Sequence, residues 1–398
     1  MAELLLEVGI ALTAVALAGA LANRVGLSVI PAYIVVGILV GPNPPSSVLG
    51  VSLNLVSDSE FIQVLAELGI VFLLFFLGLE FSVDQLLRDR GRISAAGGVD
   101  FAVNFGLGVA IGFAFGWTLL ETLFLAGVVY ISSSAVITKS LIEEGWIAND
   151  ESGPILGTLV FEDILIAVYL AILAAVAGGG DLESAAVSVG IAFVFLGGLT
   201  AVAWYGSGWL DRFFRASSDE LFVLRIVGVT TLVAGAALAL GVSEAVAAFF
   251  LGTGISQTAH VERIEHVVAP ARDIFAAVFF FSIGLTTDVT LIAGVAALLA
   301  VAVVATTVGK FVSGTFSGRF YDLDRRRSLR VGLGLVPRGE FSLVIATLAA
   351  GIGTGRLASV LPAFTVGYVL VMSVLGSVLI QQADTITDAL GARGYSNN

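Results

Sequence analysis

Two adjacent carboxylates, Glu162 and Asp163, lie deep inside an apolar stretch that covers residues 154–177. A carboxylate in the hydrocarbon of a bilayer is costly unless it is paired, hydrated or protonated, and such residues usually serve a function. The alternative is a structural role, in which the acid forms a hydrogen bond between two membrane helices. Two adjacent acids favour this alternative less than a single acid would. The pair therefore predicts a site for a cation or a proton.

The geometry of a helix separates the roles of the two acids. Adjacent residues point about 100° apart, so one acid can face a basic partner while the other faces a water-filled cavity. Lys310 is the only lysine away from the edge of an apolar segment, and pairing with Glu162 would neutralise both groups. Asp163 is then the exchangeable acid. Because a cation binds only the ionised carboxylate, H⁺ and a monovalent cation compete for it, whereas a divalent ion would favour more converging acids.

Other polar residues within the apolar segments are candidates to support this site. Hydroxyl groups supply oxygen ligands, and charges near helix interruptions pair with core charges or anchor the broken helix. The supporting residues are Ser132, Ser133, Ser134, Thr158, Arg338, Glu340 and Glu67. The metal expected at Asp163 is a monovalent cation, and no cofactor is expected.

The composition excludes a soluble globular protein. Hydrophobic residues make up 58% of the 398 residues and charged residues 13%, against about 25% charged in soluble domains. Recurring apolar segments of about 20 residues indicate an all-α polytopic membrane protein rather than a barrel. Without cysteine, thiolate metal sites and disulfides are excluded. Nucleic acid is not expected as a partner, and residues 4–22 are expected to form a retained first span.

The hydropathy pattern predicts thirteen transmembrane spans joined by short connections, with no soluble domain. They cover about 4–22, 29–47, 61–82, 94–117, 119–140, 154–177, 184–206, 219–240, 243–258, 271–287, 289–316, 329–351 and 358–381. Spans 1–6 and 8–13 can form two inverted six-helix repeats, with span 7 as a linker. Span 5 contains three consecutive serines and its counterpart, span 12, contains Pro337 among glycines. Paired interruptions of this kind indicate crossed broken helices around an ion site, although small residues also serve close packing.

The basic residues predict the orientation in the cell membrane. Almost all of the 19 lysines and arginines fall in one alternating set of connections or at adjoining span edges. Basic residues accumulate on the cytoplasmic side, so the N-terminus is expected outside and the C-terminus in the cytoplasm.

Several segments resemble the monovalent cation:proton antiporters, in the branch of bacterial sodium/proton exchangers and Kef-type potassium efflux proteins. They occur in family order along essentially the whole chain. The matching segments are 31–42, 67–80, 132–136, 161–164 (Phe-Glu-Asp-Ile), 279–284, Lys310 and 338–342 (Arg-Gly-Glu-Phe-Ser).

The resemblance implies a homodimer that works by elevator-type alternating access. It implies a dimerisation domain from spans 1–3 and 8–10 (about 1–92 and 219–288), and a transporting core from spans 4–6 and 11–13 (about 93–177 and 289–383). It also implies that Asp163 carries the ion and that Lys310 pairs with the preceding acid. The Glu-Asp pair departs from the family's commoner Asn-Asp, Asp-Asp or Gln-Asp, which leaves selectivity and stoichiometry open. A separate cytosolic regulatory subunit is a further expected partner, since no nucleotide-binding domain follows the last span.

The sequence favours an antiporter that exchanges H⁺ for Na⁺ or K⁺ for ion and pH homeostasis, and not an enzyme. The main alternative is a gated potassium efflux pathway under a separate regulatory subunit. An intramembrane aspartyl protease is the enzymatic alternative, from Asp181 in a GxGD pattern and Asp322 in a YD pattern. Both acids fall in predicted connections on opposite sides of the membrane, which disfavours it. A sensor without transport would leave the paired interruptions without a purpose.

Overall fold

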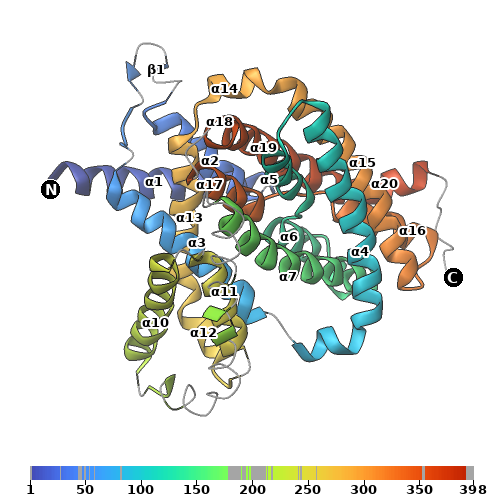
Figure 1. Ribbon diagram of the computed structural model, residues 1–398, viewed down its shortest axis with the longest axis horizontal. Helices are drawn as coiled ribbons and strands as arrows, with labels where there is room; N and C mark the ends of the chain where they lie inside the picture. Colours follow the sequence, from blue (N-terminus) through green and yellow to red (C-terminus); the bar gives the residue numbers. More distant parts are fainter. Residues whose placement is uncertain are drawn as a thin grey trace. The chain divides into compact units, whose positions relative to one another are not determined.

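A computed structural model of the chain shows a helical protein (Figure 1). It describes residues 2–26, 28–43, 47–48, 51–52, 54–57, 59–80, 83–177, 190, 194–195, 197–198, 212, 214–216, 218–240, 242, 244–256, 258–351 and 355–390. Span 7, predicted at 184–206, lies largely outside these residues. The GxGD pattern at 178–181 lies wholly outside them.

The described residues form helices along the chain. The first half contains α1 (Ala2–Arg24), α2 (Val29–Val40), α3 (Glu60–Glu80), α4 (Val83–Ala114), α5 (Leu119–Tyr130), α6 (Ser134–Glu143), the 3₁₀ turn η1 (Trp146–Ala148) and α7 (Ser152–Ala177). The second half contains α10 (Asp219–Ala239), α11 (Glu244–Ile255), α12 (Val261–Val267), α13 (Ala269–Thr286), α14 (Val289–Gly294), α15 (Ala296–Phe320), α16 (Arg325–Gly334), α17 (Glu340–Gly351), α18 (Gly355–Ala358), α19 (Val360–Gln381) and α20 (Ala383–Ala389). A small antiparallel hairpin joins β1 (Ser47–Val48) to β2 (Val51–Ser52).

The helical membrane character predicted from composition is confirmed. Within the described residues, eight helices are long and apolar enough to cross a bilayer, and four further apolar helices are shorter. Every predicted span except span 7 contains one or more of these helices. The count of thirteen spans and the inverted repeat remain predictions.

Span 2 is shorter than predicted. The helix α2 ends at Val40, and Gly41 takes an extended conformation instead of continuing toward residue 47. The next residue, Pro42, disfavours helical backbone at Gly41 because its ring crowds the preceding residue.

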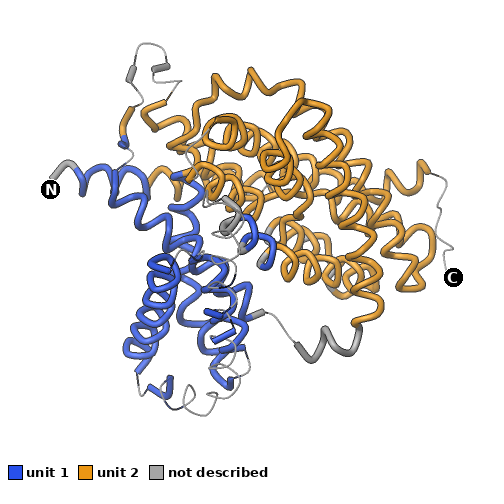
Figure 2. The backbone as a smooth tube through the Cα atoms, in the orientation of Figure 1, with its two compact units in different colours: residues 1–12, 56–87, 167–282 blue, residues 13–55, 88–166, 283–398 orange. Residues whose placement is uncertain are grey.

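The chain separates into two compact units, coloured differently in Figure 2. Unit 1 comprises 1–12, 56–87 and 167–282, and unit 2 comprises 13–55, 88–166 and 283–398. Residues 13–55 fall in unit 2, where the backbones of Ile34 and Gly284 approach closely. These boundaries differ from those predicted for the dimerisation and transport domains, and the roles given to those ranges remain predictions.

Unit 1 contains a tight contact between helices α3 and α11. A Cβ atom placed on Gly78 would lie 2.1 Å from the carbonyl oxygen of Phe249, and one on Gly252 would lie 2.0 Å from that of Phe75. Only glycine permits this approach of two backbones, which is how membrane helices gain dispersion energy without a hydrophobic driving force. The two glycines thus fix α3 against α11.

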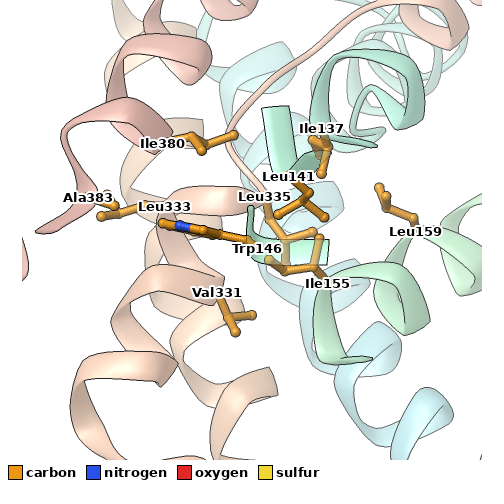
Figure 3. Packing of buried hydrophobic residues seen from close by; sticks show 10 residues of the cluster. All are labelled: Ile137, Leu141, Trp146, Ile155, Leu159, Val331, Leu333, Leu335, Ile380 and Ala383. Atoms are coloured by element: carbon orange, nitrogen blue, oxygen red, sulfur yellow. The ribbon is translucent and has the colours of Figure 1, made fainter. Parts of the chain in front are cut away.

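Unit 2 has a buried apolar cluster around Trp146 (Figure 3). The cluster contains Ile137, Leu141, Trp146, Ile155, Leu159, Val331, Leu333, Leu335, Ile380 and Ala383. Its members come from α6, η1, α7, α16, the segment after α16, α19 and α20. Their packing holds the beginning of α6 against the end of α16, next to the candidate site.

Candidate functional site

The first interruption, predicted in span 5, lies between α5 and α6. Helix α5 ends at Tyr130, Ile131 is extended, and α6 begins at Ser134 with the Ser133 hydroxyl accepting a hydrogen bond from the backbone N–H of Val136. The cap satisfies one of the orphan N–H groups of the new helix. The interruption also releases the backbone N–H of Ser132 from helical bonding, and this N–H donates to Glu162 at 2.6 Å.

The second interruption, predicted in span 12, comprises residues 335–339 between α16 and α17. It contains Pro337, which cannot donate a backbone hydrogen bond. The two interruptions meet: the Ser133 N–H donates to the Pro337 carbonyl at 3.0 Å. A Cβ on Gly339 would lie 2.4 Å from the Ser133 hydroxyl oxygen, so glycine is required for this approach.

Arg338 anchors the second interruption. Its guanidinium is fully buried and donates to the carbonyls of Leu335 at 3.1 Å and Val336 at 2.9 Å. It also reaches the first broken helix, because Nε donates to the Val129 carbonyl at 3.2 Å. Arg338 thus bonds backbone carbonyls at both interruptions, which is the geometry that an anchor of the broken helix needs; its role remains a prediction.

Lys310 of α15 lies between two buried acids. Its Nζ donates to Glu162 Oε1 at 2.5 Å and to Asp100 Oδ2 at 2.6 Å, and all three side chains have no exposed surface. The contact between Lys310 and Glu162 expected from the sequence is thus present. One ammonium faces two carboxylates, so the fully ionised triad carries one negative charge.

Both acids of the triad receive further hydrogen bonds. Glu162 accepts from the Ser132 hydroxyl at 3.0 Å as well as from its N–H. Asp100 Oδ1 accepts from the Ser313 hydroxyl at 2.7 Å and from the Asn104 amide at 2.9 Å. Buried ionised groups require such donors, because desolvation outweighs the attraction of an imperfect pair.

Asp163 has a different environment from its neighbour. Its residue is 7% exposed against 0% for Glu162, and the Ser134 hydroxyl donates to its two carboxylate oxygens at 3.4 and 3.5 Å. Glu162 thus faces the lysine while Asp163 faces a hydroxyl at the start of α6. The two acids therefore point to different partners, as the 100° spacing predicted; a water-filled cavity at Asp163 remains a prediction.

The other predicted supporting residues are distributed more widely. Glu340, at the start of α17, accepts from the Ser133 hydroxyl at 2.6 Å. The Thr158 hydroxyl donates to the Pro154 carbonyl within its own helix. Glu67 belongs to α3 in unit 1 and is exposed there. The functional roles of all these residues remain predictions.

The structure adds residues that the sequence did not assign to the site. Asp100 is a charged residue within predicted span 4, and Asn104 follows it one turn later, whereas Ser313 lies near Lys310 in span 11. The i, i+4 spacing of Asp100 and Asn104 places them on one face of α4, which was the available clue. The ring of Tyr130 lies 5.1 Å from Lys310 Nζ, where an aromatic face attracts a cation.

Of the two acids named for the enzymatic alternative, the structure describes only Asp322. Asp322 forms an ion pair with Arg92 at 2.9 Å, and its side chain is 82% exposed. No cluster of three or more His, Asp or Glu able to hold a metal ion occurs among the described residues.

Broken helices that meet beside buried acids define the general class of secondary ion transporters. The chain belongs to the sodium/hydrogen exchanger family, because the protein-family model described as "Sodium/hydrogen exchanger, transmembrane" matches its residues 10–382.

Curated relatives and solved structures agree with this family. The chain is 39% identical over 388 residues to the K(+)/H(+) antiporter subunit KhtU of Bacillus subtilis, covering 97% of this chain and 95% of that protein. It is 30% identical over 387 residues to the ammonium/H(+) antiporter subunit AmhT of Alkalihalophilus pseudofirmus, covering 96% and 94%. The sodium proton antiporter MjNhaP1 of Methanocaldococcus jannaschii has the same fold, with a TM-score of 0.69, 15% identity and 98% of each chain covered.

Proposed function

We propose that the protein is an antiporter that exchanges H⁺ for a monovalent cation, with Asp163 as the shared site. The observation that supports this proposal is the contrast between the two adjacent acids, Glu162 and Asp163. Lys310 engages Glu162, whereas Asp163 lies beside the Ser134 hydroxyl with part of its surface exposed. An acid in this position can hold either a proton or a cation, and such competition couples the two fluxes.

The proposed cation is Na⁺ or K⁺, with Glu162 and Lys310 setting the charge balance. Relatives described as K(+)/H(+), Na(+)/H(+)-K(+) and ammonium/H(+) antiporters support a monovalent ion. The proposed ligands besides Asp163 are the hydroxyls of Ser132, Ser133 and Ser134 with Thr158 of α7. Glu340, Arg338 and Glu67 are proposed as supporting charges.

We further propose an elevator-type cycle in a homodimer, with the N-terminus outside the cell and the C-terminus in the cytoplasm. A rigid core is needed for such movement, and the contacts between the two interruptions supply one. Two relatives are named as antiporter subunits, which supports a separate regulatory partner. Exchange of H⁺ for Na⁺ or K⁺ would serve ion and pH homeostasis.

The test is exchange in proteoliposomes that hold a pH gradient and contain a fluorescent pH reporter. Na⁺, K⁺, Li⁺ and NH₄⁺ are added in turn, with protein-free liposomes as the control for passive leakage. Dissipation by a monovalent cation is expected, and Asp163→Asn should abolish it. Asp388→Asn removes an acid that is 53% exposed and should transport normally.

Two outcomes would contradict the proposal. Robust exchange by assembled Asp163→Asn would show that another group carries the ion. Cation flux through the wild-type protein without movement of H⁺ would instead favour the gated efflux pathway.

A further inference from the structure

Asp100 is a fully buried acid that the two-acid site does not require. It lies on α4, while the acidic pair lies on α7 and the lysine on α15. Lys310 could be neutralised by Glu162 alone, yet its Nζ is shared at nearly equal distances of 2.5 and 2.6 Å. A second buried carboxylate adds a desolvation cost that a merely structural pair would not need.

Hydrogen bonds hold the carboxyl group of Asp100 in place. The Ser313 hydroxyl and the Asn104 amide both donate to Oδ1, which leaves Oδ2 directed at the ammonium. Asn104 also donates to Ser313, so the three residues form a closed network between α4 and α15. Three donors on one carboxylate fix its orientation.

The charge balance of the site follows from this arrangement. Among the described residues, the charged or titratable groups of the site besides Asp100 are Lys310, Glu162, Asp163, Tyr130, Arg338 and Glu340. With the phenol neutral and the other groups ionised, the cluster carries two negative charges. Without Asp100 it would carry one. A negative charge in a poorly screened interior strengthens the binding of any cation nearby.

We propose that Asp100 is a positioning residue that holds Lys310 away from Asp163 and leaves the ion site with one additional negative charge. This inference rests on the proposed function, because it concerns the strength of the same site. Removal of the Asp100 charge weakens the binding of both the cation and the proton at Asp163. The apparent KM for the cation then rises, and transport reaches half of its maximum at a lower pH.

The first variant is Asp100→Asn, assayed in the proteoliposomes in which the wild-type protein exchanges H⁺. The expected result is a rise of about tenfold in KM at alkaline pH, where proton competition is weakest, and a shift of the pH profile by about one unit toward acid. The control is Glu151→Gln, an acid 1% exposed whose partner is Arg330. It should change neither quantity.

A second variant guards against misfolding. Asp100→Glu keeps a carboxylate at this position of α4, so the total charge remains that of the wild type. Its KM should lie within about threefold of the wild-type value, because the charge beside the ion site is retained.

The outcomes separate the inference from the proposed function. A wild-type KM and pH profile in Asp100→Asn, with only a lower maximal rate, would assign Asp100 a purely structural role. A tenfold higher KM in folded, monodisperse Asp100→Glu would also overturn the inference. Absence of exchange by the wild-type protein would contradict the proposed function, and this inference with it.

Discussion

Replacement of Lys310 by methionine tests the buried triad. The change removes the ammonium that bonds Asp100 and Glu162 at 2.6 and 2.5 Å and leaves both acids buried. Removing one partner of a buried ion pair costs about 3–5 kcal/mol, because the remaining charge is uncompensated. At about 2 °C per kcal/mol for a domain of this size, the melting temperature should fall by about 6–10 °C.

The assay is thermal unfolding of the purified protein in detergent, followed by the loss of the monodisperse peak in size-exclusion chromatography. Lys139→Met is the matched control, since Lys139 bonds the Asn23 side chain at an exposed position. It should shift the melting temperature by about 2 °C or less. The combined variant Lys310→Met with Asp100→Asn should recover part of the loss, because one uncompensated acid is removed. A melting temperature of Lys310→Met within about 2 °C of the wild type would refute the reasoning.

Three further predictions concern packing, pH and the ion site. Gly78→Ala should destabilise the protein by about 1–3 kcal/mol, because the added Cβ would lie 2.1 Å from a backbone carbonyl oxygen of α11. The control is Gly106→Ala, whose Cβ meets open space; in the same melting assay it should be neutral or slightly stabilising. A hydrogen bond from Arg330, together with the positive charge of Arg330, lowers the pKa of Asp384. The stabilisation of the fold by ionised Asp384 is therefore present above the ordinary pKa near 4 and is lost as the pH falls through the lowered value. Asp384→Asn should make the melting temperature less dependent on acid pH. Ser134→Ala should raise the apparent KM for the cation a few-fold without abolishing exchange, and an unchanged KM would exclude the hydroxyl as a ligand.

Hydropathy and interruptions were readable from the sequence because they are local signals. Apolar length predicted the membrane helices, and serine, glycine and proline clusters predicted the two interruptions that the structure shows at 131–133 and 335–339. The pairing of Lys310 with Glu162 was also predictable. A lone lysine within apolar segments requires a carboxylate, and few were available.

The role of Asp100 was not predictable by the same reasoning. Its contact with Lys310 joins residues separated by 210 positions, and its direction depends on how α4 and α15 are rotated about their axes. Hydropathy does not determine that rotation when both helices are apolar on nearly every face. The grouping of residues 13–55 in unit 2 likewise depends on packing between distant segments.

The hydrogen bonds of Arg338 have a consequence for the durability of the broken helices. The carbonyls of Val129, Leu335 and Val336 each accept from its guanidinium, and the Ser342 hydroxyl donates to the carbonyl of Val128. These carbonyl groups are therefore bonded by side chains of the protein itself. They need no bound ion to satisfy them, so this part of the broken helices can keep its conformation whether or not an ion is present.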